Sequence, residues 1–374
     1  MSRGRIFFFS VLGLAVGAPR AATEPIFLSR QYTRCTNCHF SPTGGGLLTP
    51  YGRSLSREEL STFGASRGSG TPGREQEFLF GALGKGLGPV SVGIDLRPSH
   101  LSLDSAGYSS SRDFLMNAAL AAALQFRKWT FYGQVGRQPR GDDARVTSFE
   151  HWVAYQSDKG LGVRVGRFLP AYGVRLADHT AFTRATLGFD NDDQIYGVEL
   201  SYKSDRQLVQ VAAGPGRAES LLNDDEQGAF TAAGRWQFDL RPRTVLVASG
   251  AFRDASDLEP RSGAAGLALG IAPGSRLTLW TEADIRFREG SSGEPAYTLF
   301  GQAAYEVYRG VWLEVSPQVR TQFGDASAGV FRVSVALNLL PRTHWNVVVS
   351  FYNDRDRKTE NSSRTLLAQL HLYL

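Results

Sequence analysis

The chain of 374 residues has few cysteines and, after its first twenty residues, no long apolar segment. With only two cysteines, a framework of several disulfides is excluded. No later apolar run reaches the roughly 20 residues of a transmembrane helix. The net charge of +5 includes Arg3 and Arg5, and no basic stripe suited to nucleic acid is present. No His/Asp/Glu cluster has the tight spacing of a metal site.

The two cysteines form the most specific motif of the sequence. Cys35 and Cys38 are three positions apart, and His39 follows directly. This is the attachment signature of c-type haem: two thiols on one helical turn form thioethers, and the adjacent imidazole binds the iron as proximal ligand. The sequence therefore predicts one haem c, held by Cys35 and Cys38 and ligated by His39. A structural disulfide or a redox-active Cys-x-x-Cys pair are the alternatives.

The N-terminal residues indicate export. Arg3 and Arg5 precede an apolar run over 6–17 and then small residues, a pattern typical of a secretory signal peptide, which we place at 1–22. The run is too short to span a bilayer. Because haem c is attached outside the cytoplasm, the signal peptide and the haem motif support each other.

The remaining chain is rich in glycine, with 41 in all, and alternates apolar and polar residues over stretches such as 161–168, 277–287 and 330–337. Such alternation over about ten residues is typical of membrane-spanning β-strands. We count about sixteen segments and predict an all-β, outer-membrane barrel of antiparallel strands. The segments are 90–103, 113–126, 128–137, 146–157, 160–169, 193–203, 206–214, 227–239, 242–253, 262–272, 275–288, 296–307, 310–322, 330–340, 343–354 and 363–374.

The connections between these segments alternate between short, basic turns and long, acidic loops. This asymmetry matches a barrel in the outer membrane with both termini in the periplasm. The chain also ends on a strand with an aromatic residue, Tyr373, beside the terminus. Acidic loops such as 142–143 and 224–226 would concentrate cations such as ferrous iron at the outer rim, unless they are simply solvated. A soluble β-sandwich is the alternative fold.

Residues 23–75 are predicted to form a small mono-haem cytochrome c segment, and 76–374 the barrel. Glycines at 44–46 let the backbone pass close to the porphyrin. Tyr51 and Arg53 are candidates to bind the haem propionates, and Ser56 to open a short helix with a capping box. Residues 64–74 form a Gly/Ser-rich linker. The segment is too small for an independent domain, so we expect it to plug the barrel or cap its periplasmic mouth.

The sixth ligand of the haem iron is less strongly indicated. His179 is the preferred candidate, because it lies in the loop 170–192, which by our count is the third external loop and in many porins folds into the lumen. His100 and His151 are the other candidate histidines. Met116 is the least favoured candidate, because the alternation of Phe114, Met116 and Leu120 predicts that it faces lipid.

On the motif Cys35, Cys38 and His39, the chain resembles the fused cytochrome-porins of the outer membrane, in which a mono-haem c segment precedes a porin-like barrel. This family includes iron oxidases of iron-oxidising bacteria. Residues 166–173 and 178–180 are also similar to porins associated with extracellular electron transfer. The resemblance implies electron transfer between an extracellular donor or acceptor, Fe(II) among them, and periplasmic c-type cytochromes. A passive porin with a structural haem and a haem peroxidase are the alternatives.

Overall fold

The computed structural model describes residues 25–63, 88–105, 107–137, 146–190, 193–215, 230–255, 260–291 and 294–373. The predicted signal peptide at 1–22, the linker at 64–74 and the acidic loop segments at 142–143 and 224–226 lie outside these residues.

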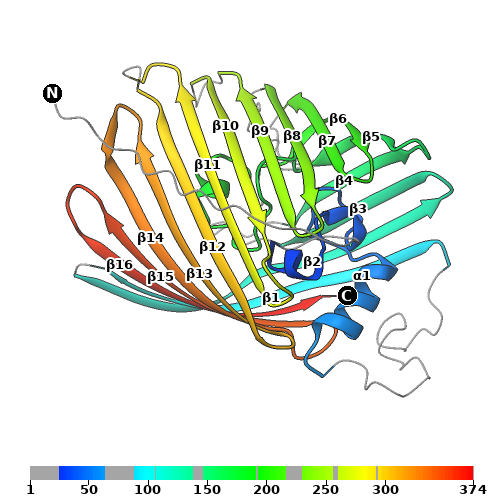
Figure 1. The fold of residues 1–374 in the computed structure, drawn as a ribbon, viewed down its shortest axis with the longest axis horizontal. Coiled ribbons are helices and arrows are strands. Elements are labelled where there is room, and N and C mark those ends of the chain that lie inside the picture. The colour runs from blue at the N-terminus through cyan, green and yellow to red at the C-terminus, as the bar shows by residue number, and fades with distance from the viewer. Residues whose placement is uncertain are drawn as a thin grey trace.

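Sixteen antiparallel strands form one closed barrel, in which each strand pairs with its neighbours in the sequence and β1 pairs with β16 (Figure 1). The predicted all-β barrel is therefore confirmed, and closure leaves no unpaired sheet edge. The strands are β1 (Val90–Ser105), β2 (Tyr108–Phe126), β3 (Trp129–Arg137), β4 (Val146–Gln156), β5 (Leu161–Phe168), β6 (Ile195–Lys203), β7 (Gln207–Pro215), β8 (Phe230–Arg241), β9 (Thr244–Arg253), β10 (Ser262–Ile271), β11 (Leu277–Arg288), β12 (Ala296–Tyr308), β13 (Val311–Gln322), β14 (Asp325–Leu339), β15 (Trp345–Asp356) and β16 (Ser362–Tyr373).

The two faces of the barrel wall differ in polarity. On β5, Leu161, Val163 and Val165 are exposed on the outside, whereas Arg164 between them is buried towards the lumen. Arg164 Nη2 donates to Glu199 Oε2 of β6 at 2.7 Å. The period of two in the sequence thus produces an apolar outer face and a polar inner face, the arrangement that suits a barrel surrounded by lipid.

The short helices lie before the barrel and in one of its loops. Turns of 3-10 helix form at η1 (Pro25–Arg30) and η2 (Cys35–Asn37), followed by α1 (Pro50–Leu55) and the π-helical turn η3 (Ser56–Leu60). The predicted helix start at Ser56 is wrong. Thr49 is the N-cap, accepting from Gly52 N at 3.1 Å, and Pro50 occupies the first turn, where its missing N–H is tolerated. None of the helices in the described residues is long and apolar enough to cross a membrane.

Residues 25–63, which we call the plug, pack at the short-turn end of the barrel: the first part lies inside the lumen, and α1 lies at the mouth near the end of β16 (Figure 1). The ring of Phe27 meets Trp312 of β13 edge to face, with centroids 6.1 Å apart. Thr62 N donates to Leu340 O at 2.8 Å, and Arg309 Nη2 donates to Glu58 O at 2.6 Å. The plug is therefore fixed to the turns between strands as well as to the inner wall.

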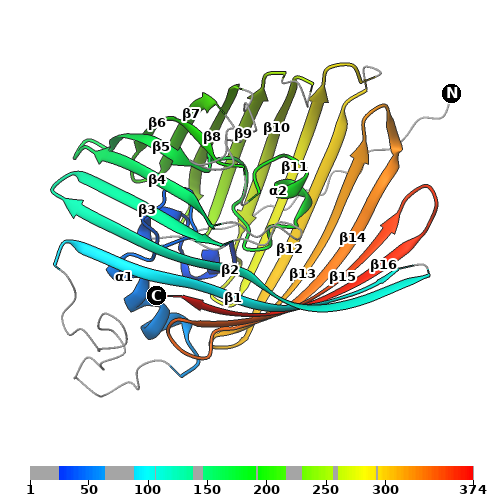
Figure 2. The ribbon, with the colours of Figure 1, turned by 180° about the vertical axis from the view of Figure 1, so that it is seen from behind.

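A second segment enters the lumen from the long-loop side. We call residues 169–190 the inner loop; it contains α2 (Phe182–Ala185) and lies within the ring of strands (Figure 2). Tyr172 Oη donates to Asp284 Oδ1 of β11 at 2.9 Å, and Phe182 N donates to Gln318 Oε1 of β13 at 2.8 Å. The expected inward fold of this loop is confirmed, and plug and inner loop approach each other from opposite ends.

The predicted position of Met116 is wrong. The pairing of β1 with β2 shifts between Arg97 and Pro98, so that Asn117 pairs with Arg97, Leu115 pairs with Pro98, and Met116 is the extra residue of a bulge. Pro98 has no backbone N–H for the ladder, and a bulge accommodates this defect. The bulge turns Met116 into the lumen, where its Sδ accepts from Gln369 Nε2 at 2.9 Å.

Candidate functional site

The Cys-x-x-Cys-His motif lies on the wall of a cavity inside the barrel. The turn η2 is closed by His39 N donating to Cys35 O at 3.0 Å, which brings both cysteines and the histidine to one side. Cys35, Cys38 and His39 all line the cavity, and the two thiols are not joined in a disulfide. The structure therefore brings together the three predicted attachment residues.

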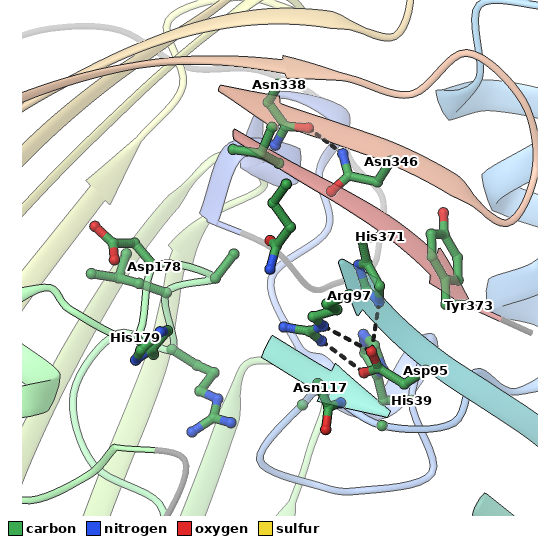
Figure 3. Close-up of a pocket in the computed structure, with 18 of the residues that line it drawn as sticks. His39, Asp95, Arg97, Asn117, Asp178, His179, Asn338, Asn346, His371 and Tyr373 are labelled. Carbon is green, nitrogen blue, oxygen red and sulfur yellow. Dashed lines mark hydrogen bonds and ion pairs between the residues drawn. The ribbon is translucent and has the colours of Figure 1, made fainter. Parts of the chain in front are cut away.

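The cavity lies between the plug, the inner loop and the strands around the β1–β16 seam, and measures about 340 Å³. This is within the range of roughly 300–1,000 Å³ found for ligand pockets. In Figure 3, His39, Asp95, Arg97 and His371 lie on one side of the pocket and His179 lies across from them. The wall thus combines residues far apart in the sequence.

The glycine loop at 44–46 is shaped for close approach. Gly44, Gly45 and Gly46 all have positive φ, at 82°, 77° and 61°. A Cβ on Gly44 would lie 3.1 Å from Cys35 Sγ, and a Cβ on Gly46 would lie 2.3 Å from the hydroxyl of Tyr132 on β3. A larger residue at position 44 would therefore crowd the Cys35 thiol, and one at position 46 would collide with Tyr132 of the barrel wall.

The imidazole of His39 is suited to binding a metal. Its Nδ1 is buried and has no partner at hydrogen-bond geometry, although the backbone of Gly45 and Gly46 lies near the ring. Burial lowers the pKa of His39 to about 4, so the ring is neutral near pH 7 and keeps a lone pair for iron.

Three side chains on the cavity wall can supply a second axial ligand. His179 lines the cavity as predicted; it is about one third exposed, and its Nδ1 lies 3.4 Å from Asp190 Oδ1. Met116 lines it because of the bulge. His371 of β16 was not predicted, yet it is close enough to His39 to interact electrostatically. Its Nε2 lies 3.2 Å from Asp95 Oδ1.

The carboxylate beside His371 is itself held in place. Both oxygens of Asp95 accept from Arg97, each at 2.8 Å. The sequence did contain a signal for His371: in Leu370-His371-Leu372-Tyr373 the leucines alternate with the polar residues, which places His371 and Tyr373 on the inner face.

The residues predicted to bind the haem propionates lie elsewhere in the plug. Tyr51 is 53% exposed, and its hydroxyl lies 3.4 Å from that of Tyr32. Arg53 Nη2 donates to Val92 O of β1 at 2.9 Å. Neither is among the residues that line the cavity, whereas Arg175 of the inner loop, which sequence reasoning did not single out, is.

Comparison with known proteins finds likeness in fold alone. No family model matches the chain, and no curated protein matches it by sequence. Among solved structures, an anion-selective porin from Comamonas acidovorans is 10% identical with a TM-score of 0.59, covering 76% of this chain and 99% of that one. OprB of Pseudomonas putida is 9% identical with a TM-score of 0.57, covering 76% of this chain and 94% of that one. OmpT of Vibrio cholerae is 11% identical with a TM-score of 0.54, covering 76% of this chain and 97% of that one. The chain thus has the fold of outer-membrane porins, and the comparisons show no fused cytochrome-porin family.

Proposed function

We propose that this chain is an outer-membrane protein that carries one covalent haem c in its lumen and transfers electrons through it. The observation that supports the proposal is that Cys35, Cys38 and His39 lie together on the wall of a lumen cavity. When bound, the haem would supply a one-electron redox centre. With both termini in the periplasm, the plug side would meet periplasmic c-type cytochromes, and the long-loop side an external donor or acceptor such as a metal ion.

Each part of the site has a task that its geometry supports. Cys35 and Cys38 would hold the haem, and the neutral imidazole of His39 would bind its iron. The plug restricts access from the short-turn end, and the inner loop restricts it from the other end. Because one haem of about 10 Å is shorter than the apolar band of about 25 Å, redox partners must reach into the barrel or carry further cofactors.

A passive porin with a structural haem is the second candidate function. It is supported by the likeness in fold to outer-membrane porins, and the comparisons favour it over electron transfer. The plug and the inner loop inside the lumen argue for a narrow pore, which makes ion conductance a second, independent measure of function.

Electron transfer is tested in liposomes that contain the purified protein and enclose a reduced soluble c-type cytochrome. With ferricyanide, which does not cross the bilayer, added outside, we expect the enclosed cytochrome to become oxidised. The matched control is the double variant C35A/C38A, which should behave like liposomes without protein. Equal rates for both proteins would contradict the proposal and leave the passive porin.

The second axial ligand is tested by replacing His371 and His179 separately with alanine. We expect H371A to convert low-spin to high-spin haem, because His371 is on a strand beside a fixed carboxylate, an arrangement that orients histidine ligands. H179A should keep the low-spin spectrum. Low-temperature electron paramagnetic resonance reads the spin state; the reverse pattern would assign His179, and a change only in M116L would assign Met116.

A further inference from the structure

Arg175 of the inner loop lies on the cavity wall next to the glycine loop. A Cβ on Gly45 would be 3.7 Å from Arg175 Nη2, and a Cβ on Gly44 would be 3.7 Å from Arg175 Cγ. The same Gly44 position is 3.1 Å from Cys35 Sγ. The Arg175 side chain and the Cys35 thiol therefore lie on either side of Gly44, and the two groups interact electrostatically.

Arg175 differs from its neighbours in having no direct partner. Its Nη1 is buried, and no hydrogen bond or ion pair joins this side chain to any residue that the structure describes. By contrast, Arg97 makes a two-pronged ion pair with Asp95, and Arg184 Nη1 donates to Leu176 O at 2.6 Å. Glu150 and Asp190 attract Arg175 only at longer range.

A guanidinium nitrogen that is buried without a partner, as Arg175 Nη1 is, is unfavourable, because its lost hydration is not replaced. Its planar fork of N–H donors fits a carboxylate with two parallel hydrogen bonds. An anionic group inside the cavity would remove the cost of burying Arg175, and a carboxylate matches its donor geometry best.

We propose that Arg175 binds a carboxylate in this cavity, and that this carboxylate is a propionate of the haem. The proposal rests on the proposed function, since it takes the haem to be present. It adds a contact across the lumen: the haem would be held covalently by the plug and by an ion pair from the inner loop. A small free anion is the other source of the same chemistry.

The test is the midpoint potential of the haem in R175Q, measured in the purified protein whose covalent haem has been verified by mass. We expect the potential to fall, because loss of a positive charge beside the haem destabilises the more negative ferrous form. An expected change of about tenfold in the reduction equilibrium corresponds to 59 mV for one electron. R175K should shift the potential less, since lysine keeps the charge but loses the fork.

R53Q is the matched control, because Arg53 is in the plug and donates to the β1 backbone without lining the cavity. Its potential should equal that of the unaltered protein. Haem-loaded R175Q with an unchanged potential would overturn the assignment of Arg175 and leave the haem proposal intact, and a shift in R53Q alone would assign the propionates to the plug. If R175Q does not fold, the midpoint potential of R175K is compared with that of the unaltered protein instead.

The free-anion source is tested in C35A/C38A, in which the cavity holds no attached haem. Calorimetric titration of C35A/C38A with inorganic phosphate and with acetate measures whether small anions bind. The same titration of the protein that also carries R175Q shows whether binding depends on Arg175. Phosphate binding that depends on Arg175, together with an unchanged potential in haem-loaded R175Q, would show that the site takes free anions and would overturn the propionate assignment. Absence of haem from the unaltered protein would instead contradict the proposed function.

Discussion

Protein purified from outer membranes should be heavier than its mature polypeptide by the mass of one haem, even after denaturation. The reason is that Cys35 and Cys38 can each form a thioether with the same porphyrin, and these bonds survive unfolding. Mass spectrometry of the denatured protein measures the difference. In C35A/C38A the added mass should disappear completely, which makes this the largest expected effect of any substitution in the chain.

Two controls give this measurement its meaning. H39A removes the proximal ligand but leaves both thiols, so we expect the haem mass to be retained while the low-spin absorption spectrum is lost. C35A/C38A should still insert as a folded barrel, because the strand ladder and lipid contacts stabilise it independently of the motif. A bare polypeptide mass for the unaltered protein, expressed with the haem-attachment machinery present, would refute the cofactor proposal.

The intact protein should conduct ions poorly in planar bilayers, because the plug lies in the lumen. Deletion of residues 25–63 should raise the single-channel conductance on the order of tenfold, since a barrel of sixteen strands without a plug leaves an aqueous channel. Phe27 and Leu60 pack with Trp312 and Leu340 of the barrel, and Phe40 and Leu47 pack against the opposite wall. The deletion replaces these contacts with water in the short-turn half of the lumen. The inner loop stays and limits the increase.

A milder variant separates plug release from changes to the barrel. R309A removes the hydrogen bonds from Arg309 Nη2 to Glu58 O and Arg57 O, which fix the plug to a short turn. We expect brief openings with the conductance of the deletion variant rather than a permanently larger current. If the intact protein already conducts as the deletion variant does, the plug does not obstruct the lumen, and this prediction is wrong.

The sequence predicted the barrel well because strand geometry repeats every two residues, and lipid outside and polar groups inside make that period visible. It failed at Met116 because one extra residue reverses the alternation, and nothing in 108–126 itself marks the bulge. The cause is Pro98, on the neighbouring strand. A pairing register must be known before such a defect can be located.

The cavity was only half predictable. Cys35, Cys38 and His39 are adjacent in sequence and carry a recognisable spacing, whereas Arg175 and His371 join them only through the closed barrel and the inward fold of the loop. The predicted helix start failed for a local reason: Ser56 has the composition of an N-cap, but Thr49 followed by Pro50 starts the helix earlier.

The position of the cavity beside the seam between the first and last strands has a consequence for assembly. Asp95 and Arg97 of β1 meet His371 and Tyr373 of β16 there, and Tyr373 Oη lies 3.1 Å from Ser56 Oγ of the plug. One wall is therefore contributed by β16, and it is complete only once β16 has paired with β1. Closure of the ring and completion of the cavity wall are therefore a single event, and a group held in the cavity would be shielded from water only from that moment.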